Sequence, residues 1–155
     1  MTVDPGFSEL YTREAPSIHA SVYALCRDPV VAQDATQEAF TRALERWDRL
    51  RDQPWVAGWI LKTACNASRR QLRRRPNPEP EAKEAPDLDL SLDLWRAVAA
   101  LPRKQQEAVI LTYHADLPSA EAALVMGCRE GTVRTHLARA RAALRLHLER
   151  SLDDV

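Results

Sequence analysis

Apolar residues recur at intervals of three and four along most of the chain, and this spacing predicts amphipathic helices. The first run covers residues 7–26 and contains Pro16, so we expect either a kinked helix or two shorter helices there. The dipeptide Asp28-Pro29 interrupts the pattern, which then resumes from Val31 to Trp47. The N-terminal part of the chain is therefore predicted to begin with helices that are separated near Asp28.

A third amphipathic run follows the polar stretch Asp48–Gln53, which predicts a loop. Pro54 suits the first position of the next helix, because a backbone N–H would have no partner there, and this helix is expected to continue to Arg75. Trp55 and Trp59 lie one helical turn apart on its apolar side. That spacing favours burial of both indoles in the core over a stacking surface.

A proline-rich acidic segment, from Pro76 to about Leu90, follows the third helix. Its composition cannot bury a core, so it predicts a flexible linker. Beyond it we expect helices at Ser91–Ala100 and Pro102–Tyr113, and then a helix-turn-helix at Ser119–Arg145. The predicted fold is all-α. It has two small helical domains, residues 1–75 and 91–155, joined by a linker at residues 76–90.

The helix-turn-helix prediction rests on three positions. Ala123 is small enough for two helices to cross closely, Gly127 can take a positive φ and end the first helix, and Val133 would pack the second helix onto the first. The second helix carries cations opposite an apolar stripe, an arrangement that suits the major groove of DNA. The cations are Arg134, Arg139, Arg141 and Arg145, and the stripe is Val133, Leu137, Ala140 and Leu144. Taken alone, the segment also fits an ordinary helical hairpin with a solvated arginine face.

Charge is segregated along the chain although the formal net charge is zero. Five arginines lie within the seven residues Arg69–Arg75, whereas Pro76–Asp93 has a net charge of −5. The end of a helix favours cations, but five exceed that role, and such dense like charges favour an anionic partner. The overall charge therefore does not argue against nucleic-acid binding.

Length and composition narrow the function classes further. The 155 residues contain no apolar run that could span a bilayer and no basic start followed by an apolar core, so we expect a cytoplasmic protein. Cys26, Cys65 and Cys128 are far apart and predict reduced thiols. The chain has no HExxH, no CxxC and no glycine-rich phosphate loop. We therefore expect no enzyme, no cofactor and no metal site.

Three stretches carry recognisable motifs in a fixed order. Residues 28–50 contain Asp-x-x-Gln-Glu-x-Phe, residues 54–75 contain Trp-x-x-x-x-Ala-x-Asn followed by arginines, and residues 101–144 contain Leu-Pro, Gly-Thr-Val and Arg-Ala-Arg. Together they resemble the extracytoplasmic-function (ECF) branch of bacterial RNA polymerase sigma factors. The resemblance implies a protein that binds core RNA polymerase and directs it to the −10 and −35 elements of promoters. It also implies regulation by an anti-sigma factor that encloses the two domains.

The resemblance assigns roles to residues on three helices. Polymerase binding falls on Asp34, Gln37, Glu38 and Arg42. Recognition of the −10 element falls on Asn66, Lys62, Arg69, Arg70, Arg73, Arg49 and Arg51. Recognition of the −35 element falls on Arg134, Thr135 and Arg139, with Arg129 and Arg141 as phosphate or packing residues.

The chemistry of these side chains agrees with the assignments. Asn66 can both donate to and accept from a base edge, and arginine can read guanine with two hydrogen bonds. Without the resemblance, the face of Asp34 would be a solvated surface with a Glu38–Arg42 ion pair. A second function class is a stand-alone helix-turn-helix regulator that binds operators as a dimer. The N-terminal half shows no obvious dimer seam, which disfavours that alternative.

Overall fold

Helices are the only regular secondary structure in residues 3–74 and 92–153, the part of the chain that the computed structural model describes. The all-α prediction is therefore confirmed. The chain divides into two compact units, Met1–Pro86 and Asp87–Val155. The predicted linker at residues 76–90 and the arginine at position 75 lie outside the described residues.

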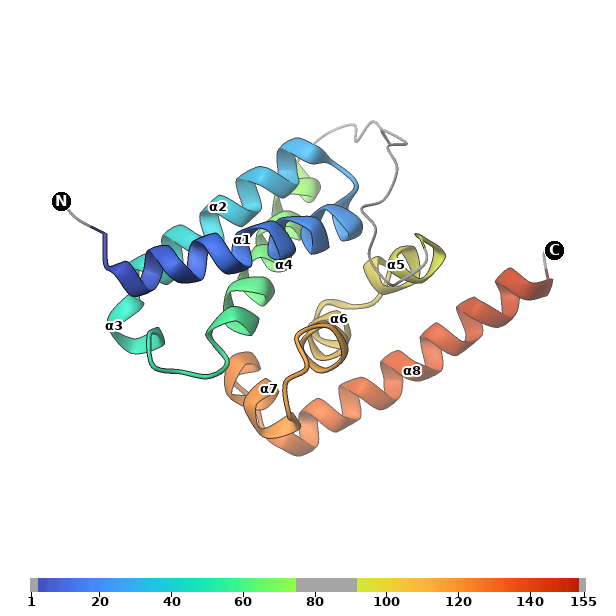
Figure 1. Cartoon of the computed structure of the whole chain (residues 1–155). Helices are drawn as coiled ribbons and strands as arrows, with labels where there is room; N and C mark the ends of the chain where they lie inside the picture. Colours follow the sequence, from blue (N-terminus) through green and yellow to red (C-terminus); the bar gives the residue numbers. More distant parts are fainter. Residues whose placement is uncertain (1–2, 75–91, 154–155) are drawn as a thin grey trace. The chain divides into compact units, whose positions relative to one another are not determined.

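The N-terminal unit contains three long helices that pack against one another, α1 (Pro5–Cys26), α2 (Pro29–Glu45) and α4 (Val56–Arg74) (Figure 1). The side chain of Asp4 caps α1 by accepting a hydrogen bond from the backbone N–H of Gly6. Asp28 caps α2 in the same way through Val30 and Val31. The buried core is built from Phe7, Leu10, Ile18, Val22, Val31, Ala35, Ala39, Phe40, Ile60, Leu61 and Ala64.

Helix α1 is continuous through Pro16, so the alternative of two shorter helices is wrong. The side chain of Pro16 is exposed, whereas Leu10 and Ile18 on either side of it are buried against the other helices. Proline removes one backbone hydrogen bond from the helix interior. The buried residues before and after it hold both halves of α1 in the same core.

The predicted loop at Asp48–Gln53 contains a one-turn helix, α3 (Trp47–Leu50). Trp47 and Leu50 are both buried, and the Trp47 indole packs edge-on against Phe7 with ring centroids 5.4 Å apart. Trp47 and Leu50 are three residues apart, so a helical turn places both side chains on the same, buried side. Pro54 precedes α4 rather than beginning it, because α4 begins at Val56.

Trp55 and Trp59 are half-buried, so the prediction that both belong to the core is wrong. The buried side of α4 is centred on Ile60, Ala64 and Ala67 instead. A helix turns by about 100° per residue, which places Trp59 about 100° around the axis from Ile60 and off the buried side. The Trp59 indole consequently lies where cationic side chains can reach it.

The C-terminal unit packs three short elements against the first half of a long helix, α8 (Glu130–Asp153) (Figure 1). These elements are α5 (Leu92–Ala99), α6 (Arg103–Val109), which runs on into a π-helical turn η1 (Ile110–His114), and α7 (Ser119–Met126). Pro102 precedes α6 as its N-cap. The largest fully buried side chains here are Trp95, Leu111 and Val133.

The predicted helix-turn-helix is confirmed by α7, α8 and the turn between them. Gly127 ends α7 with φ 68°, the left-handed conformation that glycine adopts without strain. Ala123 is buried in α7, and Val133 is fully buried in α8. Helix α8 extends beyond Arg145, the predicted end, to Asp153.

Candidate functional surfaces

The outer face of α2 carries the four residues predicted to bind polymerase. Asp34 and Gln37 are exposed, and Glu38 and Arg42 are half-buried. Arg42 lies 3.9 Å from Glu38, so the expected pair within the helix is present. Asp34, Glu38 and Arg42 follow one another at intervals of one helical turn, and Gln37 lies beside Glu38. Their role stays a prediction.

Two of these side chains are held by residues from neighbouring helices. The guanidinium of Arg70, in α4, lies 2.5 Å from Oε2 of Glu38. On the other side of α2, the side-chain amide of Gln37 donates a hydrogen bond of 2.9 Å to the hydroxyl of Tyr11 in α1. The adjacent residues Gln37 and Glu38 are thus held by side chains of two different helices, Gln37 by α1 and Glu38 by α4. Sequence reasoning missed Tyr11, because the helical period does not say which residues of two helices lie opposite each other.

Five residues predicted for the −10 element form one stripe along α4. They are Lys62, Asn66, Arg69, Arg70 and Arg73. Their spacing keeps them within about 100° of one another around the helix, on the side away from the buried Ile60 and Ala64. Arg73 is exposed and the other four are half-buried. The structure therefore gathers these residues on a single outer face, the α4 stripe.

The remaining two residues predicted for the −10 element lie near α3. Arg49 is exposed in α3, and Arg51 follows it with its guanidinium 3.6 Å from Oδ2 of Asp4. The backbone N–H of Gly6, together with Arg51, lowers the pKa of Asp4. Arg51 therefore also contributes to the start of α1.

Trp59 lies beside the α4 stripe and contacts two cations. The Arg46 guanidinium is 5.9 Å from the centre of the indole, and the Lys62 ammonium is 6.0 Å from it. Both distances fit cation–π contact. Sequence reasoning had not singled out Arg46, since it falls between two helices.

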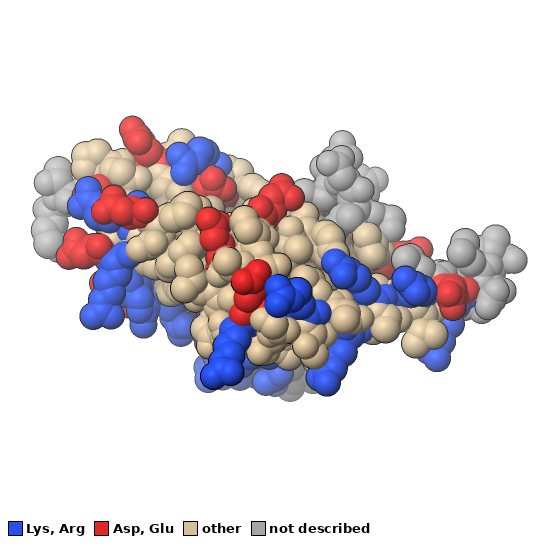
Figure 2. All heavy atoms as spheres, turned by 90° about the horizontal axis from the view of Figure 1, so that it is seen from below, with Lys and Arg blue, Asp and Glu red and all other residues tan. Residues whose placement is uncertain are grey.

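The residues predicted for the −35 element are all exposed on α8 or just before it: Arg129, Arg134, Thr135, Arg139 and Arg141. Arg134 forms an ion pair of 3.3 Å with Glu130, one turn earlier. The hydroxyl of Thr135 donates to the backbone oxygen of Gly131 at 3.1 Å. Arginine side chains project along α8 (Figure 2).

The sequence pattern predicts that the arginines of α8 share one face. The structure shows that they do not. Arg134, Arg141 and Arg145 follow one flank of the helix, whereas Arg139 lies about 140° around the axis from Arg134. Thr135, Ala138 and Ala142, all exposed, lie between the two flanks.

Arg141 packs onto Tyr113 of η1, which sequence reasoning did not identify. Its guanidinium carbon lies 5.5 Å from the centre of the tyrosine ring, and its Nε donates to the tyrosine hydroxyl at 2.6 Å. Of the two roles foreseen for Arg141, phosphate contact and packing, this geometry supports packing.

Among the described residues, no group of three or more His, Cys, Asp or Glu side chains is arranged to hold a metal ion. Cys26, Cys65 and Cys128 are not joined by disulfides. None of the described helices combines the length and apolar character that crossing a membrane requires.

Comparison with known families matches both units. Residues 10–76 match the model of Sigma-70 region 2, and residues 91–144 match the model of Sigma-70 region 4. An RNA polymerase sigma-E factor of Streptomyces antibioticus is 30% identical over 158 residues, which cover 95% of this chain and 87% of that protein. The ECF RNA polymerase sigma factor SigC of Mycobacterium tuberculosis is 33% identical over 125 residues, 73% of this chain and 68% of that protein.

Solved structures share the fold. The sigma factor RpoE from Bartonella quintana, in complex with the anti-sigma factor NepR, aligns with a TM-score of 0.67 at 24% identity over 92% of this chain and 96% of that chain. Both sigma regions are thus present in the family's order, and relatives of at least 30% identity are matched over more than two thirds of their length. The chain belongs to the ECF family of RNA polymerase sigma factors.

Proposed function

We propose that this sigma factor binds core RNA polymerase through the outer face of α2 and reads promoters with α4 and α8. The observation that carries the proposal is the presence of a helix with several arginines in each unit, α4 in the first and α8 in the second. The α4 stripe is cationic, and α8 is the second helix of a helix-turn-helix with exposed arginines. We assign residues 1–75 to polymerase binding and the −10 element, and residues 91–155 to the −35 element.

Polymerase binding by α2 is supported by the exposure and fixed geometry of its outer face. Gln37 offers amide groups and Glu38 a carboxylate, and each is restrained by a neighbouring helix. Restrained polar groups lose less conformational freedom when a partner binds. The partner surface that suits this face carries hydrogen-bond donors and at least one cation.

Contact with the −10 element is supported by the composition of the α4 stripe. Its arginines can neutralise phosphates, while Asn66 in their midst can hydrogen-bond to an exposed base edge. Opening a duplex costs a few kcal/mol per unstacked base, and contacts to a flipped base recover part of that cost. A cationic helix with an amide in its centre can supply both kinds of contact.

Contact with the −35 element is supported by the position of α8 in the helix-turn-helix. Arg134 and Thr135 lie in its N-terminal part, which is the part of a recognition helix that reaches base edges. Arg139 lies on the opposite flank and could reach the other side of the groove. Arg129, exposed just before the helix, is assigned to phosphate contact.

An anti-sigma factor is the second protein partner that we propose. Sigma factors of the same fold, such as the one from Bartonella quintana, have been solved in complex with anti-sigma factors. We further propose that the protein acts in the cytoplasm, by binding and not by catalysis.

Promoter binding with and without core polymerase tests the function against the stand-alone regulator, which the family membership does not favour. Fluorescence anisotropy of a labelled promoter duplex should show specific binding only when the chain and core polymerase are both present. Tight, sequence-specific binding by a dimer of the chain alone would overturn the proposal. A duplex with scrambled −10 and −35 elements provides the control.

A further inference from the structure

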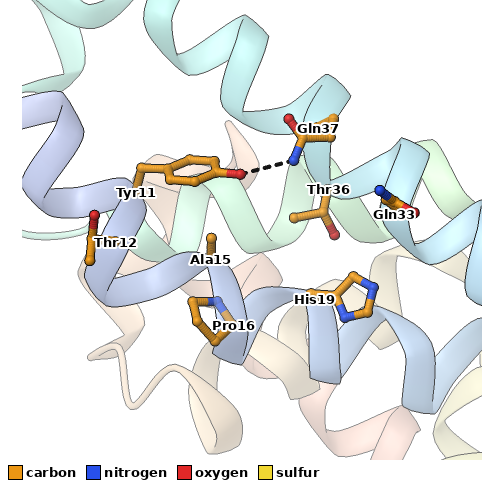
Figure 3. Close-up of a pocket in the computed structure, with 8 residues that line it drawn as sticks. All are labelled: Tyr11, Thr12, Ala15, Pro16, His19, Gln33, Thr36 and Gln37. Atoms are coloured by element: carbon orange, nitrogen blue, oxygen red, sulfur yellow. Dashed lines mark hydrogen bonds between the residues drawn. The ribbon is translucent and has the colours of Figure 1, made fainter. Parts of the chain in front are cut away.

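Gln37 lies at the edge of a cavity between α1 and α2 with a volume of about 490 Å³. Residues of α1, including Ala15 and Pro16, form one wall, and Gln33, Thr36 and Gln37 of α2 form the other (Figure 3). Beside such a space a glutamine side chain has few packing neighbours to restrict its rotamers. Hydrogen bonding is then the main force that can hold it in place.

The Tyr11 hydroxyl supplies that hydrogen bond. The side-chain Nε2 of Gln37 donates to it at 2.9 Å, across the cavity edge from α2 to α1 (Figure 3). This contact uses one N–H of the amide and leaves its second N–H and its carbonyl oxygen for another partner. The hydrogen bond thereby fixes the orientation of the exposed Gln37 amide and still leaves it able to bind a partner.

Tyr11 can act as a fixed point because its own ring is anchored. The ring packs edge-on against Phe40, with centroids 4.8 Å apart, and Phe40 is buried in the core of the unit. Phe40 in turn contacts Phe7 edge-on at 6.3 Å. The hydroxyl therefore sits on an aromatic cluster that joins α1 to α2, while 36% of Tyr11 remains exposed.

We propose that Tyr11 is a positioning residue for polymerase binding and acts through Gln37. The inference rests on the proposed role of the α2 face. In the free protein Tyr11 holds the Gln37 amide in one orientation, so that less side-chain freedom is lost when polymerase binds. Tyr11 itself need not touch the polymerase.

A double-mutant cycle with the full-length chain and core RNA polymerase tests this inference. Tyr11→Phe removes only the hydroxyl, and Gln37→Ala removes the group that it positions. We expect Tyr11→Phe to weaken core binding by about two- to fivefold. Gln37→Ala should weaken core binding at least as much, and the double variant should bind no more weakly than Gln37→Ala alone.

Tyr23→Phe is the matched control, because Tyr23 also lies in α1 and its buried hydroxyl has no hydrogen-bond partner among the described residues. It should bind core polymerase like the wild type. Unchanged binding by Tyr11→Phe, with Gln37→Ala impaired, would overturn the inference and leave the α2 assignment intact. Additive losses in the double variant would also overturn it, because Tyr11 would then act independently of Gln37.

If Gln37→Ala binds core polymerase normally, both the inference and the polymerase role of Gln37 are wrong. A transcription assay with Gln37→Ala then tests the sigma function itself. Promoter-dependent transcripts would show that this function holds and that only the role given to Gln37 is wrong. A thermal unfolding curve of Tyr11→Phe that matches the wild type shows that lost binding does not come from lost folding.

Discussion

The Arg70 guanidinium of α4 lies 2.5 Å from the Glu38 carboxylate of α2. This ion pair joins the α4 stripe, which we assign to DNA, to the face that we assign to polymerase. Both side chains are about one third exposed, at 37% and 33%, so the pair contributes only ~0–1 kcal/mol. A pair of that strength can be exchanged when either side chain meets another partner.

Glu38→Gln should release Arg70 and raise the affinity of the isolated chain for DNA. Loss of a half-exposed ion pair of ~0.2–1 kcal/mol corresponds to an increase of up to about fivefold. Fluorescence anisotropy with a labelled DNA duplex at low salt measures this change.

Glu45→Gln controls for the removal of one negative charge, because Glu45 is exposed near the end of the same helix. We expect the affinity for DNA to increase more in Glu38→Gln than in Glu45→Gln. Equal increases in the two variants would mean that the Glu38–Arg70 pair does not restrain Arg70.

Local sequence spacing predicted much of the fold, and long-range pairing explains what it missed. The helix-turn-helix follows from Ala123, Gly127 and Val133, which lie within one short segment. In contrast, Tyr11 and Gln37 are 26 residues apart, and the helical period identifies the exposed side of each helix but not the residues that meet across two helices. The one-turn helix α3 was missed for a related reason, since four residues are too few to show a period.

The candidate surfaces were partly predictable in the same sense. The α4 stripe follows from spacing alone, because residues 62, 66, 69, 70 and 73 necessarily share a side of any helix. The contact of Arg141 with Tyr113 could not be foreseen, since it depends on how η1 packs against α8. The same limit applies to the contacts of Trp59 with Arg46 and Lys62.

Gly127→Ala should destabilise the C-terminal unit by about 1 kcal/mol. A Cβ atom at this position would meet nothing within 4 Å, so the cost comes from the backbone conformation at φ 68° and not from a clash. Hydrogen exchange of the α7 and α8 amides, followed by mass spectrometry, measures the loss of stability in that unit.

Gly131→Ala is the opposite control, because Gly131 lies in the first turn of α8 and its nearest contact would be Arg134 at 4.0 Å. Alanine should stabilise the helix by roughly 0.5–1 kcal/mol. If both substitutions destabilise the unit, steric space and not backbone conformation determines the effect of alanine at these two positions.

Arg134→Ala and Arg139→Ala should each reduce discrimination among −35 sequences. An arginine that reads guanine contributes ~1–3 kcal/mol of discrimination, so single-base changes in the element should matter at least about fivefold less in the variant. Run-off transcription from a set of −35 variants measures this ratio. Arg150→Ala, which removes one exposed charge from the same helix, should lower transcription from all promoters equally.

Arg73→Ala, Arg74→Ala and Arg75→Ala combined should weaken promoter binding by the holoenzyme and flatten its salt dependence. Each lost phosphate contact reduces the slope of log affinity against log salt by about 0.9 on duplex DNA. Binding measured at several potassium chloride concentrations gives the slope. An unchanged slope would rule out phosphate contact by this block.

Acid should destabilise the C-terminal unit through His114. Burial lowers the pKa of its imidazole below the usual value of 6.5, and Asp116 opposes this effect only in part. The unfolded chain therefore takes up the proton more readily than the folded unit. Stability from the neutral imidazole is complete above about pH 6.5 and is lost as the pH falls through the lowered pKa.

Hydrogen exchange of the C-terminal unit between pH 7.5 and 5 measures the effect of His114→Gln, which should reduce the loss of stability on acidification. His147→Gln, at an exposed position of α8, makes the same substitution and serves as the control. A wild-type pH dependence in His114→Gln would assign the acid sensitivity to other groups.

Transcription with purified core RNA polymerase tests the central claim most directly. The full chain added to core enzyme should produce run-off transcripts from a family-type promoter, and mutation of either the −10 or the −35 element should abolish most of the product. Core enzyme without the chain should give no such transcript. Promoter-independent transcription, or none at all with a core enzyme that responds to another sigma factor of its own species, would contradict the account.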